Sequence, residues 1–362
     1  MRALLIVRAD AAAKPGGDVV HAENAARALR DMRFDVTVVA SDAPDARGYD
    51  VAHIFGIFEP QRAAAQIAAV RAAGVPLVLS PIWLDLRTYF AMAPEVERAL
   101  AESNPARVER RLARAREREA ELSWRGRAAT AADRRLAVQR SLLLSAEVVL
   151  PASEIEAFLY GERLKVTRVR YVVAPLGVDD DAFAEDRPAT RIGVLCAGRI
   201  ESKKNQAALL YALRDVDVEV TLLGRAYDPD YLALCKRWAT PKTRFVEHVS
   251  HAEVLRLMAR AAVHAHPSWL ESPGLSSLEA AATGARIVVG DRGSEREYFG
   301  PHVDYADPAD PESIRSAVVH ALESPPRDRG DALDRRLGRF TWENHAVATI
   351  DAYARAMVLG AQ

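Results

Sequence analysis

The sequence predicts an α/β protein built from two doubly wound parallel sheets, since buried strands alternate with helices along most of the chain. Short apolar runs, such as those over residues 3–7 and 192–197, have the length and composition of buried strands. Glycine-containing turns separate these runs from helical segments, as is typical of parallel sheets. A chain of 362 residues, with 49% hydrophobic and 27% charged residues, is globular and has room for two domains.

The first domain is expected to contain strands and helices in alternation. The predicted strands cover residues 3–7, 36–40, 51–55, 76–80, 148–151 and 170–174. Helices are predicted over residues 19–33 and 60–73, and the first of them is amphipathic. Gly16 and Gly17 form the turn before that helix. They do not make a G-x-G-x-x-G pattern, so dinucleotide binding is poorly supported and a plain tight turn is the commoner explanation.

The second domain is predicted to begin after a turn at residues 175–179, and a poorly structured linker over 180–189 leads into it. Its predicted strands cover residues 192–197, 219–223, 244–249, 261–265 and 286–290. Residues 291–297 are expected to form a loop, and an amphipathic helix is expected over residues 341–357. The same alternation therefore occurs in both halves of the chain.

Composition and charge exclude several classes of protein. The formal net charge of −1 gives no indication of nucleic-acid binding. Two cysteines, Cys196 and Cys235, exclude a disulfide framework and fit a reducing compartment, and each is expected to be a small buried side chain. Neither a signal peptide nor an apolar run of membrane-spanning length is visible, so we expect a cytoplasmic protein.

An arginine-rich stretch from Arg98 to Arg140 contains twelve arginines and six acidic residues. Its pattern is helical, with apolar residues such as Leu112 and Trp124 between the charges. The first interpretation is a solvated pair of helices that packs one side on the domain. The alternative is a basic face for an anionic membrane surface or a phosphate-bearing lipid acceptor, which would make the protein peripheral at the inner face of the membrane.

The stretch from His264 to Gly284 has the strongest functional pattern. An apolar strand ends at Pro267, a loop containing Gly274 follows, and a helix is predicted to start near Ser276. The helix N-terminus therefore lies at the carboxyl end of a strand, where unpaired N–H groups and the helix dipole favour an anion. A glycine in the loop lets the backbone approach that ligand closely.

Glu271 and Glu279 stand eight residues apart in this stretch, one in the loop and one in the predicted first helical turn. Two carboxylates at this spacing can face a single ligand that lies across the helix start. The competing interpretation treats Ser276 and Glu279 as a capping box, in which the glutamate bonds the backbone at the helix start. Taken alone, Glu279 favours the cap. Together with Glu271 and Gly274, it favours a ligand site.

A second polar cluster follows the predicted strand over residues 192–197. Gly198 and Arg199 end that strand, and Lys204 belongs to a short basic segment that is expected to open a helix. Arg199 and Lys204 therefore both lie at the carboxyl end of a strand, where a guanidinium and an ammonium can neutralise a pyrophosphate. One such cation means little by itself, because most arginines and lysines are solvated surface residues.

These two clusters resemble the motifs of a known family. The segments ESPGLSSLEAAATG and GRIESKKN are similar to the E-x7-E donor-site pattern and the G-R-x4-K diphosphate clamp of retaining GT-B glycosyltransferases of family 4. The chain has Pro273 where the family usually has an aromatic residue, Asn205 where it usually has glycine, and Leu176 where it usually has asparagine.

The first domain departs from the family in a further respect. Members commonly carry a histidine just after the fourth strand, and this chain has none there. His21 and His53 lie in the same domain, although a lone histidine is more often structural than catalytic. Asp85 follows the fourth strand and is a weak candidate for an acceptor-side group.

The resemblance implies the GT-B fold, in which two Rossmann-like doubly wound domains face each other across a cleft. Residues 1–174 would form the acceptor-side domain and residues 175–341 the nucleotide-sugar domain. The helix over residues 342–362 would pack back on the first domain. The resemblance covers essentially the whole chain and is strongest over residues 190–300.

The resemblance also implies the chemistry, which is transfer of a sugar from a nucleotide-sugar to an acceptor hydroxyl with retention of the anomeric configuration. Glu271, Arg199 and Lys204 would act in catalysis. The residues that would bind the donor are Glu279, Gly274, Leu275, Ser276, Gly16, Gly17 and Gly198. The nucleotide-sugar is a co-substrate, and neither a further cofactor nor a metal is implied.

The expected partners are the nucleotide-sugar and a glycan, lipid-linked or small-molecule acceptor, in the synthesis of a bacterial surface polysaccharide or glycoconjugate. Two alternatives stay open. One is a catalytically silent GT-B partner that only binds nucleotide-sugar, against which the intact donor motifs argue. The other is a nucleotide-sugar epimerase, which would need acids and histidines on both sides of the sugar, so that the missing histidine argues against it.

Overall fold

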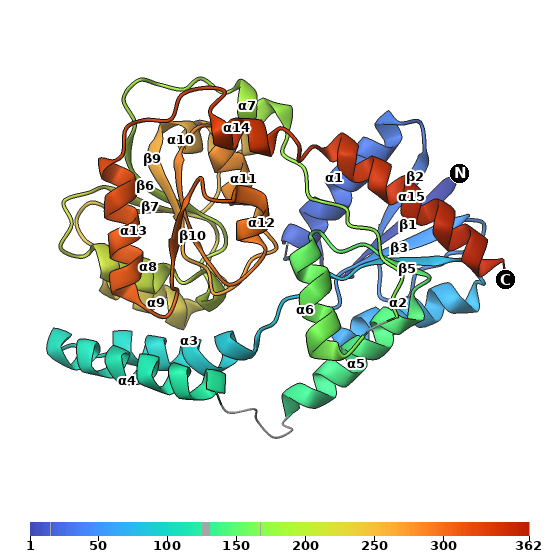
Figure 1. Cartoon of the computed structure of the whole chain (residues 1–362), viewed down its shortest axis with the longest axis horizontal. Helices are drawn as coiled ribbons and strands as arrows, with labels where there is room; N and C mark the ends of the chain where they lie inside the picture. The colour runs from blue at the N-terminus through green and yellow to red at the C-terminus, as the bar shows by residue number, and fades with distance from the viewer. Residues whose placement is uncertain (15, 125–130, 167, 362) are drawn as a thin grey trace. The chain divides into compact units, whose positions relative to one another are not determined.

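The computed structural model describes residues 1–14, 16–124, 131–166 and 168–361. Within those residues the chain divides into two compact units. The first unit contains residues 1–85, 131–177 and 339–361, and the second contains residues 86–124 and 178–338. Each unit is built around one parallel sheet (Figure 1).

The first unit contains a five-stranded sheet with strand order β2-β1-β3-β4-β5. Its strands are β1 (Arg2–Val7), β2 (Asp35–Ala40), β3 (Val51–Phe55), β4 (Leu77–Ser80) and β5 (Val148–Val149). Its helices are α1 (Gly17–Asp31), α2 (Pro60–Ala72), α5 (Ala131–Ser145), α6 (Glu154–Leu164) and α15 (Trp342–Gly360). Helices α1 and α15 cover one face, and α2, α5 and α6 cover the other (Figure 1). This double cover explains why β3 consists only of buried residues.

The second unit contains a six-stranded sheet with strand order β11-β10-β9-β6-β7-β8. Its strands are β6 (Ile192–Ala197), β7 (Val220–Leu223), β8 (Thr243–Val246), β9 (Ala261–His266), β10 (Arg286–Gly290) and β11 (Asp304–Ala306). Its helices are α3 (Arg87–Leu100), α4 (Pro105–Trp124), α7 (Asp180–Ala184), the 3-10 turn η1 (Ser202–Lys204), α8 (Gln206–Leu213), α9 (Pro229–Arg237), α10 (His251–Arg260), α11 (Leu275–Ala282), α12 (Glu295–Phe299), α13 (Pro311–Glu323) and α14 (Ala332–Leu337). Helices α8 and α13 pack together on one face, while α10 and α11 pack together on the other. All strand pairs in both sheets are parallel, as the sequence predicts.

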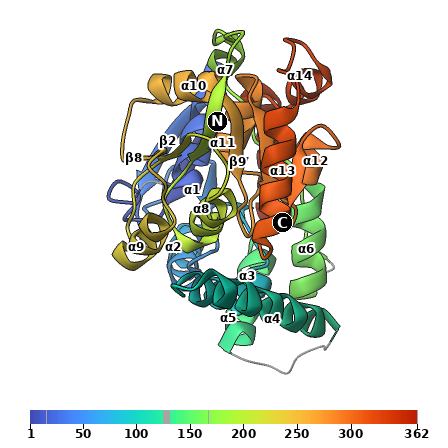
Figure 2. The ribbon, with the colours of Figure 1, turned by 90° about the vertical axis from the view of Figure 1, so that its left-hand side faces the viewer.

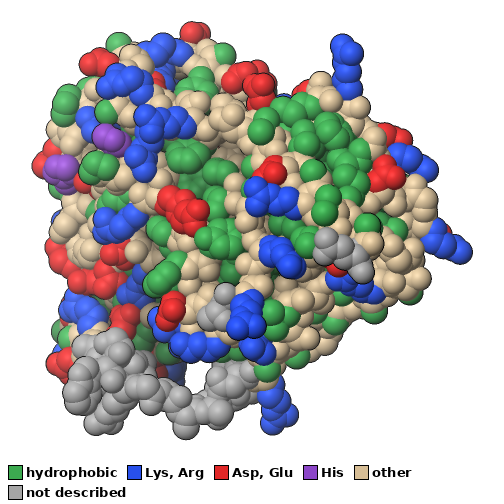
Figure 3. Space-filling view, turned by 45° about the vertical axis from the view of Figure 1, so that its right-hand side comes forward, with side chains coloured by type: hydrophobic (Ala, Val, Ile, Leu, Met, Phe, Trp, Pro, Cys, Tyr) green, Lys and Arg blue, Asp and Glu red, His purple; other side chains and the backbone are tan. Residues whose placement is uncertain are grey.

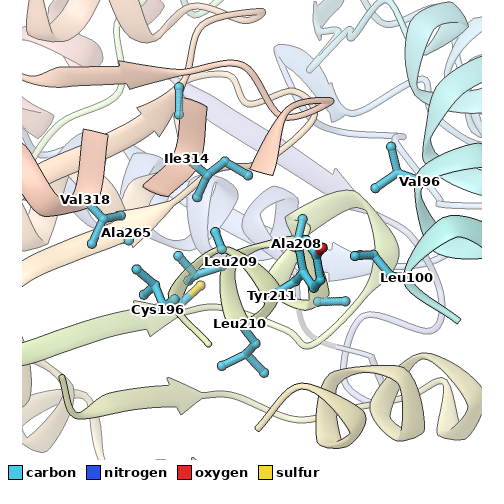
Figure 4. Packing of buried hydrophobic residues seen from close by; sticks show 14 of the residues in the cluster. Val96, Leu100, Cys196, Ala208, Leu209, Leu210, Tyr211, Ala265, Ile314 and Val318 are labelled. Atoms are coloured by element: carbon cyan, nitrogen blue, oxygen red, sulfur yellow. The ribbon is translucent and has the colours of Figure 1, made fainter. Parts of the chain in front are cut away.

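Helices α3 and α4 belong to the second unit, although the sequence places them in the first domain. They lie side by side in both views of the ribbon (Figure 2). Val96 and Leu100 of α3 face Ala208 and Tyr211 of α8, and all four side chains are nearly inaccessible to solvent (Figure 4). This apolar contact explains the difference, because sequence order does not reveal which core a surface helix will cover.

Several local predictions are corrected by the structure. Residues 180–184 form helix α7 and not an unstructured linker, since two aspartates in its first turn stabilise the N-terminus. Residues 170–174 form a single bridge beside β5, which has only two residues. The expected loop over 291–297 ends at Glu295, where α12 begins.

The arginine-rich stretch is helical in its described parts, while residues 125–130 lie outside the described residues. Arg116 pairs with Asp310 at 2.5 Å and Arg118 with Glu95 at 2.8 Å, so these arginines are engaged within the protein. Basic and acidic side chains are interspersed on the face drawn in Figure 3. In the part of the chain that the structure describes, no helix has an apolar stretch long enough to cross a membrane.

Candidate functional site

The sheet of the second unit reverses its direction of growth between β6 and β9. From β6 the chain adds β7 and β8 on one side, and it then returns to add β9 and β10 on the other. The loops that follow β6 and β9 therefore lead away from each other at the carboxyl end of the sheet. In open α/β sheets this point is the usual place for a ligand.

An ion pair joins these two loops. Lys204 Nζ donates a hydrogen bond to Glu271 Oε1 at 2.5 Å, and the two side chains are only 14% and 10% exposed. Trp269 N also donates to Lys203 O at 2.9 Å, so the loops are joined through their backbones as well. Burial opposes ionisation of the Glu271 carboxyl, but the positive charges of Lys204 and Lys203 outweigh it and lower its pKa below the ordinary value.

Asn205 ends the segment that carries Lys204. The two lysines expected to open a helix lie in the 3-10 turn, and α8 begins only at Gln206, because Asn205 adopts a left-handed conformation with φ 62°. Asparagine tolerates this conformation better than most residues. Its Nδ2 donates to Pro267 O at 3.2 Å and to Pro308 O at 2.8 Å, which holds the loops after β6, β9 and β11 together. Asparagine therefore supplies the backbone geometry that glycine would allow, together with two hydrogen bonds.

Helix α11 begins beside Glu271. Gly274 is its N-cap residue, with φ 87° and ψ 98°, and a Cβ there would lie 3.4 Å from Glu271 Cγ. The N–H groups of Leu275 and Ser276 occupy the first turn, where no intrahelical acceptor is available to them. The strand–glycine–helix arrangement thus directs two backbone donors toward the neighbourhood of the ion pair.

The capping-box interpretation of Ser276 and Glu279 is wrong. The helix starts at Leu275, so Glu279 lies in the second turn and does not reach the helix N-terminus. Its Oε1 lies 3.0 Å from Nε2 of His251, the first residue of α10. Ser276 Oγ lies 3.3 Å from His266 Nδ1. Both side chains are therefore free of the backbone role that the sequence pattern suggests.

Arg199 and Gly198 follow β6 directly. Arg199 Nη2 donates to Glu201 Oε1 at 3.1 Å, and its side chain remains 37% exposed. Gly198 has φ 152°, and a Cβ there would approach His266 Cε1 to 3.3 Å. The glycine thus makes room for the imidazole at the end of β9.

Two buried polar groups near the ion pair were missed by the sequence analysis. His266 Nε2 lies 4.0 Å from Glu271 Oε1 and has no hydrogen-bond partner among the described residues. The Glu295 carboxyl is likewise buried, with backbone groups of Gly293 and of Glu295 itself close to it. Burial, and then the charge of Lys204, lower the pKa of His266; burial raises the pKa of Glu295 well above its ordinary value. An unsatisfied buried nitrogen such as His266 Nε2 is rare in native proteins, and here it borders the proposed ligand position.

The remaining sequence candidates lie in the first unit. Gly16 is the N-cap of α1 in an extended conformation, and a Cβ on Gly17 would meet nothing within 4 Å. His53 is buried, with its two ring nitrogens 2.9 Å from Tyr353 Oη and 2.9 Å from Ser80 Oγ. This is the structural role that a lone histidine usually has.

Two further residues of the first unit are engaged within it. His21 is buried and contacts His345, with 3.3 Å between their Nε2 atoms. Asp85 pairs with Arg163 at 3.0 Å. Across the described part of the chain, no group of three or more His, Cys, Asp or Glu side chains is arranged to hold a metal ion. Both cysteines are buried, and burial raises the pKa of the Cys196 thiol to about 12, as expected of an unreactive side chain.

Comparison with known proteins supports the interpretation of the second unit. Residues 178–337 match the model of the family described as glycosyl transferases group 1. The chain is 33% identical over 187 residues to glycogen synthase of Mycobacterium tuberculosis, a match that covers 48% of this chain and 45% of the relative. It is 31% identical over 212 residues to D-inositol 3-phosphate glycosyltransferase of Arthrobacter sp., covering 51% of this chain and 50% of the relative. The chain thus spans about half the length of the curated relatives that it matches.

Solved structures resemble the chain over its whole length. Sucrose-phosphate synthase from Thermosynechococcus elongatus superimposes with a TM-score of 0.72 at 18% identity, covering 100% of both chains. HepE of Anabaena, solved in complex with UDP and glucose, gives a TM-score of 0.66 at 15% identity and covers 98% of this chain and 99% of its own. These similarities confirm the predicted fold class, the two-sheet GT-B architecture.

Proposed function

Because the chain carries a glycosyl transferases group 1 domain over residues 178–337, we propose that the protein is a retaining glycosyltransferase that uses a nucleotide-sugar donor. The observation that carries the proposal is the Lys204–Glu271 ion pair, which lies at the switch point of the sheet and beside the start of α11. It combines a cation, a carboxylate and the backbone donors of a helix N-terminus within one small region. A sugar linked to a diphosphate needs this combination.

The diphosphate would be bound by cations and backbone donors. Lys204 supplies a point charge and Arg199 a planar guanidinium, while the N–H groups of Leu275 and Ser276 add hydrogen bonds at the helix start. Negative charge grows on the leaving diphosphate as the glycosidic bond breaks. Donors that already point at that charge stabilise the transition state more than the ground state, which is the main catalytic task of the site.

The two glutamates would bind the two ends of the donor. Glu271 holds Lys204 through Oε1, and a carboxylate has further acceptor capacity for sugar hydroxyls and for the positive charge that develops on the sugar. Glu279 would accept hydrogen bonds from the ribose hydroxyls. The acceptor hydroxyl would attack the sugar on the same face from which the diphosphate leaves. The anomeric configuration would then be retained without a protein nucleophile.

For the acceptor and the pathway we propose only a general class. A role in a bacterial surface polysaccharide or glycoconjugate is consistent with the relatives. They include the O-antigen chain mannosyltransferase B of Escherichia coli, which is 30% identical over 171 residues and covers 44% of this chain and 45% of its own length. The acceptor would then be a glycan, a lipid-linked sugar or a small hydroxyl compound.

A thermal-shift panel of nucleoside diphosphates and nucleotide-sugars tests this function. A ligand at 100 times its dissociation constant adds about 2.7 kcal/mol of stability, which is visible as a raised midpoint. We expect one nucleotide-sugar to stabilise the wild type and to lose most of its effect on the Arg199→Ala/Lys204→Ala variant. Transfer to acceptor hydroxyls is then assayed with that donor.

The outcomes separate the competing functions. If a nucleotide-sugar binds and is neither transferred nor hydrolysed with any acceptor offered, the chain is a silent binding partner. If its sugar is epimerised, the protein is an epimerase. If no nucleotide or nucleotide-sugar binds the wild type, the donor site proposed here is wrong.

A further inference from the structure

A histidine from one helix holds the carboxylate of another at the edge of the donor site. His251 Nε2 and Glu279 Oε1 are 3.0 Å apart, and the side chains are 57% and 18% exposed. The carboxylate is therefore sheltered while the imidazole reaches solvent. Nothing in the sequence pattern connects these residues, which are 28 positions apart.

The imidazole is held on a rigid element. Ser250 is the N-cap of α10 and its Oγ accepts a hydrogen bond from Glu253 N at 3.3 Å, which fixes the helix start immediately before His251. Helices α10 and α11 pack against each other on one face of the sheet. A side chain from one helix start thus reaches the second turn of the other, so both members of the pair lie on helices.

The charges around His251 are mainly negative. Glu279 contacts it from α11, and Asp179 and Asp181 lie near it at the start of α7. On its own helix, Glu253 pairs with Arg256 at 2.9 Å. The hydrogen bond to Glu279 raises the pKa of His251, although burial opposes the shift, and the charges of Glu279 and the two aspartates add to the increase.

We propose that His251 is a positioning residue, which orients the Glu279 carboxylate toward the ribose of the donor and makes donor binding weaken as pH rises through neutrality. This inference rests on the proposed function of Glu279. The imidazolium occupies Oε1, so the carboxylate cannot rotate freely and Oε2 is directed to a ribose hydroxyl. Its positive charge also offsets the repulsion between Glu279 and the anionic diphosphate.

The sign of the pH effect follows from the protonation of His251. Below its raised pKa the imidazolium provides both the hydrogen bond and the positive charge. Above it, the neutral imidazole can still donate from Nε2 but no longer compensates the charge of Glu279. Donor affinity should therefore fall by about threefold to tenfold between pH 6 and pH 8.5.

The test compares three variants with the wild type. His251→Ala removes the interaction, and His251→Gln retains a neutral donor of similar reach. His320→Gln is the matched control, since His320 Nδ1 lies 2.7 Å from Asp304 in another exposed histidine–carboxylate pair of the same unit. Dissociation constants are measured by calorimetry from pH 5.5 to pH 8.5 with UDP-glucose, ADP-glucose and GDP-mannose, whose phosphates carry no titrating proton in this range.

A second measurement isolates the ribose contact. UDP, ADP and GDP are compared with their 2′,3′-dideoxy analogues at pH 6. His251→Ala should weaken the ribonucleotide that binds by about tenfold and its dideoxy analogue clearly less, because the analogue keeps the diphosphate and lacks only the ribose hydroxyls. His251→Gln should be intermediate, and both His251 variants should lose the pH dependence that His320→Gln retains.

Two results overturn the inference alone. One is a pH dependence in His251→Ala equal to that of the wild type. The other is an equal loss of affinity for the ribonucleotide and its dideoxy analogue, which would indicate a general structural effect. If the wild type binds none of the probes, the proposed function fails first and the inference falls with it, so the two failures are distinguishable.

Discussion

Lys204 and Glu271 are 67 residues apart in the sequence, and the ammonium of one meets the carboxylate of the other at 2.5 Å. The contact joins the loop after β6 to the loop after β9, where the sheet of the second unit reverses its direction of growth. It is also largely sheltered from solvent. The same pair therefore stabilises the crevice and prepares it for an anionic ligand.

Breaking this pair should destabilise the second unit more than breaking an exposed one. Lys204→Met leaves Glu271 buried without its main partner, and we expect a loss of about 3 kcal/mol in the free energy of unfolding, measured in urea. The double variant Lys204→Met/Glu271→Gln should lose less than the sum of the single changes, because neither charge remains unpaired. Lys242→Met is the control: its pair with Asp217 is exposed, so the loss should stay below about 1 kcal/mol. Equal losses at the two sites would contradict this account.

Gly274 should not tolerate a side chain. Its φ of 87° disfavours any L-residue, so Gly274→Ala should cost about 1–3 kcal/mol through backbone strain and, by shifting the loop beside Glu271, weaken nucleotide binding. Gly17→Ala provides the comparison for stability alone, since it lies at the start of α1 with open space around it. That change should be neutral or stabilise by about 0.5 kcal/mol. Thermal midpoints with and without the nucleotide-sugar measure both effects.

Variants of Asn205 separate the contribution of its left-handed backbone to stability from that of its side-chain hydrogen bonds. Asn205→Gly keeps the left-handed backbone and removes two hydrogen bonds, so it should cost about 1–2 kcal/mol. Asn205→Ala should cost about 1 kcal/mol more, because alanine also disfavours this conformation. Urea denaturation of the two variants gives the order directly. A glycine variant as stable as the wild type would show that the hydrogen bonds contribute nothing.

The first unit should lose stability in mild acid because of its buried histidines. Burial lowers the pKa of His345 to about 4 from the ordinary 6.5, while His345 Nδ1 contacts the carbonyl oxygens of Ala174 and Pro175. At pH values between these two pKa values, the unfolded chain therefore binds a proton on His345 and the folded chain does not. Stability conferred by the neutral ring is complete above about pH 6.5 and is lost as pH falls toward 4, by up to about 3 kcal/mol.

Replacing the ring isolates its share of this acid sensitivity. His345→Gln should be less stable than the wild type at pH 7.5 but should lose less stability between pH 7 and pH 4.5. Trp342 lies 5.4 Å from the His345 ring, centroid to centroid, so its fluorescence reports unfolding of this region. If the wild type and the variant show the same slope of stability against pH, His345 is not the source of the effect.

The sequence by itself determined the parallel sheets and the two loops of the candidate site. Runs such as 192–197 and 287–290 are apolar throughout because helices cover both sheet faces, and that requirement is visible in local composition. Gly274 and Lys204 belong to short motifs whose spacing follows from the strand–turn–helix connection. Their positions at a carboxyl edge were therefore predictable before any tertiary contact was known.

Only the tertiary structure decided which distant groups meet. It assigned α3 and α4 to the second unit, paired His251 with Glu279, and buried the Glu295 carboxyl. Periodicity and turn chemistry depend on neighbours a few residues away, and so they appear in the sequence. The partner of a side chain at a helix start depends on how separate elements pack. The burial that results then shifts the pKa of that side chain. That packing energy is shared by many residues and no local pattern encodes it.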